Sequence, residues 1–288
     1  MRMRRNYGRR YGNYQETNLK SFFQRRKMPL NESVYGMTDV GKKRADNEDS
    51  FLLLSDKHLY IVSDGMGGHN AGDVASAQAV AALKSFLDDK NLSVMTPDEI
   101  RKTLMDAVMS AHNTVLELSR TKTEYYNMGC TLVLAFIHNN TLYTCHAGDS
   151  RAYVINHEEI VHVTTDHSVV MELVVLGKMT KEAARLSPMK NQITQALGLP
   201  QYFDPEYNRW ELKKGDTVLL CTDGLWDMLS DAQIHELIIL NNSAQEICKK
   251  LIDSANHEGG YDNITAVVIT GWAESPLNDT VSEHDLRF

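Results

Sequence analysis

The order of apolar segments along the chain restricts its fold more than any other feature. Strand-like runs come in neighbouring pairs joined by short polar turns, which is the pattern of antiparallel hairpins. Segments with helical spacing of apolar residues also come in pairs. The strand pairs are 51–54 with 58–63, 131–137 with 142–146, and 153–155 with 160–163, followed by single strands at 217–221 and 264–269; the helix pairs are 75–87 with 100–118, and 231–240 with 243–255. This order predicts an α+β fold in which helices cover antiparallel sheets, rather than repeated βαβ units.

Charge divides the chain into three parts. Residues 1–30 carry nine Arg or Lys and one Glu, so their charge of +8 leaves −16 on the rest of a chain whose net charge is −8. We expect a basic, flexible arm at 1–30, one body at 31–270 and an acidic tail at 271–288. The arm is interpreted as a solvated tail or one lying on the acidic body, with docking to an anionic surface as the alternative. The acidic body argues against nucleic-acid binding.

Composition and cysteine spacing favour a cytoplasmic protein. No window holds the roughly 18 apolar residues that a membrane span needs, and no apolar stretch follows the Arg-rich start. The four cysteines are scattered without a Cys-x-x-Cys pair, which is typical of reduced, buried thiols. We take a monomer as the default state.

Acidic residues gather beside Gly or Asn at the ends of the expected strands. A single Asp-Gly turn is more often structural than catalytic. Here the pattern recurs at 44–49, 64–69, 148–151, 222–227 and 261–263. Carboxylates that converge would repel one another and retain protons unless a cation joined them, and ligands that are all oxygen favour Mg²⁺ or Mn²⁺. With Arg44 to hold a phosphoryl group by its two-pronged guanidinium, the pattern favours a two-metal phosphohydrolase.

These segments, in this order, resemble the metal-dependent Ser/Thr protein phosphatases of type 2C, the PPM family. The resemblance covers roughly residues 34–270. The matching pieces are Arg44 with Asn47-Glu48-Asp49, Asp64-Gly65-Met66-Gly67-Gly68, Gly148-Asp149-Ser150-Arg151, Asp166-His167-Ser168, Asp223-Gly224-Leu225-Trp226-Asp227, and Asp262-Asn263. The resemblance implies a four-layer αββα sandwich, two antiparallel sheets flanked by helices, with the metal site at one end between the sheets.

The resemblance also implies roles for the matching positions. Five residues resemble the ligands of two Mn²⁺ or Mg²⁺ ions, namely Asp64 as the bridge, Asp223 and Asp262 on the first ion, and Glu48 and the Gly65 carbonyl on the second. Asp49 resembles a residue that orients metal-bound water, and Arg44 resembles the phosphate clamp. A weaker third-metal site is matched by Asp149, Asp223 and Asp227.

Met66 departs from the animal members of the family, which commonly carry a proton-donating His directly after Asp-Gly. The motif Asp-Gly-Met-Gly-Gly-His looks like the bacterial branch. We interpret metal-bound water as the acid that protonates the leaving alcohol. His69 is the alternative acid, beside its interpretation as a loop side chain hydrogen-bonded to backbone.

Residues 168–189 stand where the family has its flap. Apolar positions from Val169 to Leu176 predict an amphipathic helix that begins after Ser168, includes Leu173 and ends at Gly177, and 180–186 predicts a second short helix. We favour a mobile wall that selects substrates over an ordinary packed helical pair. Trp226 is expected to pack in the core rather than against substrate.

The resemblance implies an enzyme that hydrolyses phosphoserine and phosphothreonine on proteins. A hydroxide between two metal ions would attack phosphorus directly, and the enzyme would oppose a Ser/Thr kinase in bacterial-type signalling. Two alternatives stay open. One is a non-enzymatic pseudophosphatase scaffold, although every ligand position is filled by an oxygen donor. The other is a metallohydrolase of small phosphoesters or nucleotides, although the chain has no G-x-x-x-x-G-K-[ST] phosphate cradle.

Overall fold

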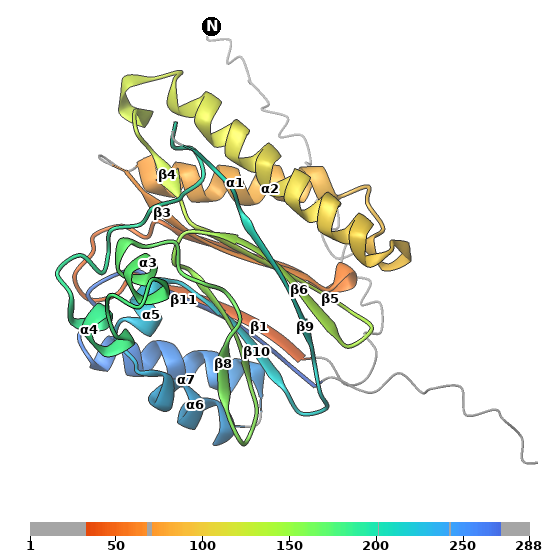
Figure 1. Ribbon diagram of the computed structural model, residues 1–288, viewed down its shortest axis with the longest axis vertical. Helices are drawn as coiled ribbons and strands as arrows, with labels where there is room; N and C mark the ends of the chain where they lie inside the picture. The colour runs from red at the N-terminus through yellow and green to blue at the C-terminus, as the bar shows by residue number, and fades with distance from the viewer. Residues whose placement is uncertain (1–32, 68–70, 201, 242, 272–288) are drawn as a thin grey trace, which may run out of the picture.

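Two antiparallel sheets lie face to face in the computed structural model, with a pair of helices on the outer side of each (Figure 1). The structure describes residues 33–67, 71–200, 202–241 and 243–271. The predicted four-layer αββα sandwich is therefore confirmed. The expected arm at 1–30 and nearly all of the tail at 271–288 lie outside the described residues.

The first described strand of the chain, β1, lies at one edge of the five-stranded sheet. The order of this sheet is β1-β11-β10-β7-β8, and every neighbouring pair is antiparallel. The strands are β1 (Ser33–Asp39), β11 (Ile264–Thr270), β10 (Thr217–Cys221), β7 (Arg151–Ile155) and β8 (Ile160–His162).

The six-stranded sheet has the order β2-β3-β5-β6-β9, and a short β4 pairs with the end of β3. The strands are β2 (Asp49–Leu54), β3 (Leu59–Met66), β4 (Gly129–Cys130), β5 (Leu132–His138), β6 (Thr141–Ala147) and β9 (Glu206–Glu211). The turn from β5 to β6 is made by Asn139 and Asn140 with φ of 48° and 54°, a left-handed geometry that Asn tolerates.

The helices form two outer layers and one small unit. α1 (Ala71–Leu87) and α2 (Pro97–Ser119) cover the six-stranded sheet, and α6 (Asp231–Ile239) and α7 (Ala244–His257) cover the other (Figure 1). Between β8 and β9 the chain forms α3 (Val169–Val175) and α4 (Lys181–Leu186), and α5 (Asp223–Trp226) directly follows β10. No helix in the described ranges is long and apolar enough to cross a membrane.

Apolar side chains fill the three spaces between the four layers. In β3, Leu59 and Ile61 pack under α1 and α2, whereas Tyr60 and Val62 pack between the sheets, as the two-residue period of a strand requires. All four are fully buried. A strand buried on both faces reads as a continuous apolar run, which is why the sequence located it.

Besides the two-residue β4, two strands, β1 and β9, were absent from the sequence prediction. β1 contains Gly36, whose hypothetical Cβ would lie 2.6 Å from Phe51, so the glycine allows a close approach between the sheets. β9 is a polar edge strand, Glu-Tyr-Asn-Arg-Trp-Glu, that pairs only with β6 in the described structure. Neither has the branched apolar run that marks a strand in sequence.

Candidate active site

A pocket of about 340 Å³ opens at one end of the sandwich and gathers acidic side chains from both sheets. Its lining is Arg44, Glu48, Asp64, Gly65, Met66, Gly67, Thr131, Asp149, Asn191, Ile193, Asp223 and Asp262. The carboxylates come from the β1–β2 loop, the end of β3, the residue pair after β6, the start of α5 and the residue two before β11. Five chain segments that are distant in sequence therefore meet at one site.

Backbone contacts bring the β2 and β3 ends of the site together. Asp49 and Asp64 are register partners, and the Gly65 N–H donates to the Glu48 carbonyl at 3.1 Å. A Cβ on Gly65 would collide with the Gly72 carbonyl and lie 2.6 Å from the Glu48 carbonyl. Glycine is thus required at 65, where the backbone itself lines the pocket.

The carboxylates of the pocket are strongly destabilised as anions. Burial raises the pKa of Asp223 to about 6, with the charge of Asp262 adding to the effect, and the Asp64 carboxyl hydrogen-bonds to it. The pKa values of Asp64 and Asp149 are also well above the usual range. Burial is the main cause, and the charges of neighbouring carboxylates add to it. Burial raises the pKa of Glu48 as well, against the opposing charge of Arg44. Such a set is stable as anions only with cations nearby.

Asp49 lies behind the pocket and is oriented by two hydroxyls. Its Oδ2 accepts hydrogen bonds from Thr222 Oγ1 at 2.9 Å and from Thr265 Oγ1 at 2.6 Å. Burial raises its pKa to about 7 even though both hydroxyls act in the opposite direction. Its Oδ1 and the Oδ1 of Asp223 are buried without a hydrogen-bond partner in the described structure. These two oxygens, one on Asp49 and one on Asp223, are therefore available to accept a hydrogen bond or to bind a cation.

Arg44 is held at the mouth of the pocket by the acidic residues themselves. Its Nη2 donates to Asp262 Oδ2 at 2.8 Å, and its Nη1 lies 3.8 Å from Glu48 Oε2. About half of the side chain is exposed, so the guanidinium faces both the carboxylates and solvent. This position suits a group that meets an incoming anion.

The two remaining third-site candidates are placed differently. Asp149 lines the pocket, and its backbone carbonyl accepts from Trp226 Nε1 at 3.0 Å. Asp227 lies outside the lining, where Lys190 Nζ contacts both of its oxygens at 2.5 and 2.6 Å. Trp226 is buried in the core around α6 and α7, as predicted, and Arg151 stacks on its ring at 3.6 Å.

The flap-like segment has the two predicted helices. Ser168 caps α3 by accepting from the Met171 N–H at 3.3 Å, and Gly177 ends it with φ of 67°. Leu173 is half-buried, and none of these three residues lines the acidic pocket. The part of the acidic pocket's lining that comes from this region is Asn191 and Ile193, which lie just after the flap-like segment. The flap-like segment borders a separate pocket of about 380 Å³ that includes Ser168, Arg151 and Trp226.

Several residues that organise the site were not predicted. Asn263 Oδ1 accepts from the Glu48 N–H at 2.8 Å, while its Nδ2 donates to the carbonyls of Val40 and Asp46. Thr222 and Thr265 hold Asp49 as described above. Thr222 and Asn263 stand directly beside Asp223 and Asp262 in sequence, so a search of each motif's neighbours would have found them. Thr265 carries no such signal.

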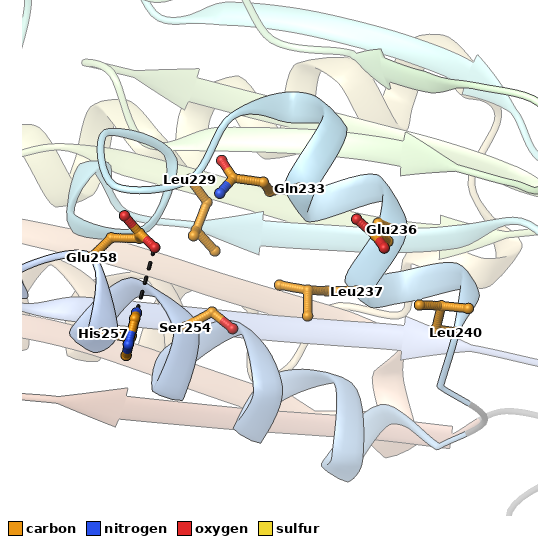
Figure 2. Close-up of a pocket in the computed structure, with 8 residues that line it drawn as sticks. All are labelled: Leu229, Gln233, Glu236, Leu237, Leu240, Ser254, His257 and Glu258. Carbon is orange, nitrogen blue, oxygen red and sulfur yellow. Dashed lines mark ion pairs between the residues drawn. The ribbon is translucent and has the colours of Figure 1, made fainter.

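Other features of the chain lie apart from this site. A pocket of about 290 Å³ between α6 and α7 is lined by leucines and by Glu236, His257 and Glu258, with His257 Nδ1 3.5 Å from Glu258 Oε1 (Figure 2). The four cysteines are free and buried, and burial raises the pKa of each thiol. Met66 lines the acidic pocket, whereas His69 falls outside the described residues.

An acidic pocket with one Arg at its mouth, set between the sheets of an αββα sandwich, defines the class of metal-dependent phosphohydrolases. The family model described as protein phosphatase 2C matches residues 41–267. The chain is 36% identical to the protein phosphatase PhpP of Streptococcus pneumoniae over 238 residues, which cover 81% of this chain and 95% of PhpP. The chain belongs to the protein phosphatase 2C family, and it is a serine/threonine protein phosphatase by that membership.

Solved bacterial structures agree with this assignment. The serine/threonine phosphatase of S. agalactiae has a TM-score of 0.78 and 33% identity, and the match covers 84% of this chain and all of that one. The catalytic domain of the serine threonine protein phosphatase PstP, solved in complex with two manganese ions, has a TM-score of 0.73 and 33% identity over 83% of this chain and 98% of that one.

Proposed function

We propose that this phosphatase hydrolyses phosphoserine and phosphothreonine on proteins with two divalent cations, Mn²⁺ or Mg²⁺, in the acidic pocket. The observation that carries the proposal is the convergence of buried and partly buried carboxylates around one Arg. The residues that would hold the ions are Asp64, Asp223, Asp262, Glu48 and the Gly65 carbonyl, all of which line the pocket.

The residues fit such a pair of ions in chemistry and in position. All the donors are oxygens, which hard cations prefer. The raised pKa values of Asp64, Asp223 and Asp149 show a surplus of negative charge. The unpartnered Oδ1 of Asp223 and the backbone that only Gly65 allows leave donor atoms available.

The chain's own groups would bind and orient the phosphorylated residue. When bound, the ions supply a water of lowered pKa as nucleophile and neutralise charge on the phosphoryl oxygens. Arg44 would hold two phosphoryl oxygens by charge-assisted hydrogen bonds, giving up part of its contact with Asp262. Asp49, fixed by Thr222 and Thr265, would accept a hydrogen bond at its free Oδ1 and so orient the attacking water. Met66 cannot donate a proton, which leaves water as the acid for the leaving alcohol.

The remaining expectations extend this proposal. Asp149 would join Asp223 and Asp227 at a weaker third ion, once Lys190 released Asp227. The segment 168–189 would act as a substrate-selecting flap. The phosphoproteins would be those of a Ser/Thr kinase in bacterial-type signalling, and the basic arm 1–30 would be an appendage to a catalytic body at 31–270. Four free, buried cysteines support a reducing, cytoplasmic location. A monomer stays the default state.

The proposal is tested by hydrolysis of a phosphothreonine peptide by the full chain, with and without Mn²⁺. Asp223→Asn removes one ligand charge, and Asp253→Asn, on the exposed face of α7, is the matched control. We expect metal-dependent turnover in the wild type and the control, and a loss of at least about a hundredfold in Asp223→Asn, the order of effect that removal of a charge-stabilising group has.

Three results would refute the proposal. Turnover that survives chelation of all divalent cations would exclude the metal pair. Metal binding without turnover of any phosphopeptide would favour the scaffold, and faster turnover of nucleotides than of phosphopeptides would favour a small-molecule hydrolase.

A further inference from the structure

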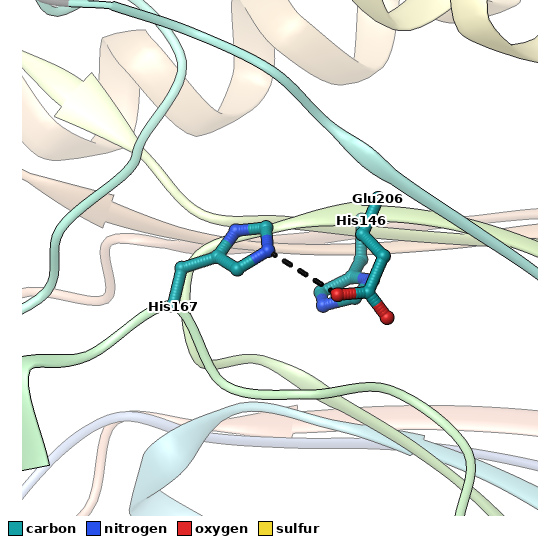
Figure 3. A group of neighbouring side chains, drawn as sticks. All are labelled: His146, His167 and Glu206. Atoms are coloured by element: carbon teal, nitrogen blue, oxygen red, sulfur yellow. Dashed lines mark ion pairs between the residues drawn. The ribbon is translucent and has the colours of Figure 1, made fainter. Parts of the chain in front are cut away.

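A second cluster of ligand-type side chains lies beside the acidic pocket. His146, His167 and Glu206 each offer one ligand atom, and these atoms lie within 4.8 Å of one another. Figure 3 shows His167 pointing toward Glu206 with His146 behind it. His146 and Glu206 are register partners in β6 and β9, so they share one face of the six-stranded sheet. Unlike the acidic pocket, this cluster contains nitrogen donors.

His146 is already oriented as a metal ligand. Its Nε2 lies 2.8 Å from the Thr165 carbonyl, an acceptor, so Nε2 carries the proton and Nδ1 carries the lone pair. That Nδ1 is buried and has no partner among the described residues. Metal-binding histidines characteristically donate their second ring N–H to a carbonyl or a carboxylate. Because Nε2 is held by the Thr165 carbonyl, the lone pair on His146 Nδ1 is oriented and available to bind a metal ion.

The surroundings of His146 contain a second orphan. Thr144 precedes it by two residues on the same face of β6, and its Oγ1 is also buried without a partner in the described structure. Buried polar atoms without protein partners normally mark an ion or an ordered water. This face of β6 points between the sheets, because Leu142 on the same face belongs to the inter-sheet core.

His167 and Glu206 supply the other two donors. Glu206 Oε2 lies 3.7 Å from His167 Nε2, and the ring of His167 stacks on that of His146 with centroids 4.8 Å apart. A hydrogen bond from the His167 ring lowers the pKa of Glu206 to about 2, and a second one from Asn208 adds to this effect. Burial acts in the opposite direction but is outweighed. Glu206 is thus ionised at neutral pH, and burial lowers the pKa of His146, which keeps that ring neutral.

We propose that His146, His167 and Glu206 form a separate binding site for Zn²⁺, through His146 Nδ1, His167 Nε2 and the Glu206 carboxylate. Two imidazoles with one carboxylate suit this borderline ion, whereas Mg²⁺ and Mn²⁺ favour the all-oxygen pocket. Zinc–nitrogen bonds of about 2.0 Å set tetrahedral ligand atoms roughly 3.3 Å apart, so the cluster must contract on binding. The fourth position is open to water.

Occupancy of this site acts on the wall of the acidic pocket. Without metal, the His167 ring accepts at Nδ1 from the Gly148 backbone N–H at 3.3 Å, and the backbone N–H of His167 donates to the Gly148 carbonyl at 2.9 Å. Ligation through Nε2 moves the His167 ring proton to Nδ1, which ends the bond from the Gly148 N–H. Gly148 directly precedes Asp149 of the acidic pocket. Zinc binding therefore loosens one anchor of that segment without touching an acidic ligand.

The test measures Zn²⁺ binding to the full chain in an Asp64→Asn, Asp223→Asn background, which weakens the acidic pocket as a competitor. Three variants are made separately in this background: Glu206→Gln, His146→Gln and, as the control, His157→Gln in the exposed β7–β8 turn. Glu206→Gln serves if the buried His146→Gln fails to fold, since Gln retains the oxygen that accepts from Asn208. Zinc-edge anomalous diffraction then locates the ion, and amide exchange at Gly148 reports the coupling.

We expect one Zn²⁺ per chain in the background and in the control, a Kd at least about tenfold weaker in Glu206→Gln, and an anomalous peak among the three side chains. Zinc should also speed exchange of the Gly148 amide in the background but not in Glu206→Gln. No zinc bound in the background, or a Kd equal in Glu206→Gln and His157→Gln, would overturn the site. Because no readout is turnover, this result is independent of the proposed phosphatase chemistry.

Discussion

Neutralising one carboxylate of the acidic pocket should stabilise the metal-free protein. Asp223 is partly buried beside Asp262 and Asp64, and desolvation raises its pKa from 3.8 to about 6. Asp223→Asn keeps the shape of the side chain and removes its charge. In EDTA the variant should therefore unfold at higher urea than the wild type.

The size and pH dependence of this gain follow from linkage. The pKa of the folded state lies above that of the unfolded state, so ionisation of Asp223 opposes folding. The penalty begins near pH 4, grows as the pH rises, and is complete above about pH 6. A shift of about two pKa units corresponds to about 3 kcal/mol, an upper bound because neighbouring carboxylates titrate together. At pH 5 about half of that should remain.

The assay is urea unfolding in EDTA at pH 5 and pH 8, with the exposed Asp253→Asn as control. With saturating Mn²⁺ the order should reverse, because the wild type gains the binding free energy of the ions and the variant largely loses it. The reasoning fails if Asp223→Asn is no more stable than the wild type at pH 8 in EDTA, or if its gain is the same at both pH values.

Further outcomes are expected at other positions. Thr222→Val removes one of the two hydroxyls on Asp49 and should lower kcat about tenfold or more with little change in KM, as measured by steady-state kinetics on a phosphopeptide. Gly65→Ala drives a Cβ into the Gly72 carbonyl and should abolish tight Mn²⁺ binding in calorimetry; unaltered binding would exclude that crowding. The pKa of Glu206 is about 2, so its negative charge stabilises the fold above about pH 4.5, and this contribution is lost as the pH falls toward 2. The melting temperature of Glu206→Gln should therefore lie below that of the wild type at neutral pH and approach it in acid.

The positions of the helices and buried strands were predictable because burial imposes a period on the sequence. β5, β6, β10 and β11 are runs of buried residues, and α1, α2, α6 and α7 carry apolar faces. β1 and β9 were missed because each lies at a sheet edge and carries Gly or charged residues, so its strand conformation comes from pairing with a neighbour.

The acidic positions of the site were likewise visible as motifs, but their supports were not. Asn263 and Thr265 touch Glu48 and Asp49 across more than 200 residues of chain. The pairing of Lys190 with Asp227, and the wall made by Asn191, likewise depend on how the segment after α4 returns to the sheets. Contacts of such separation leave no local pattern.

The amino-acid sequence alone determined the family, the layered α+β architecture and the set of carboxylates, because apolar periodicity and Asp-Gly turns are local properties of the chain. Only the tertiary structure decided which groups are buried together, and so which carboxylates are destabilised as anions and which are supported by hydroxyls. It also placed His146 beside His167 and Glu206. The physical reason is that desolvation and charge repulsion depend on distance in space, which the pairing of β6 with β9 and the meeting of the two sheets establish.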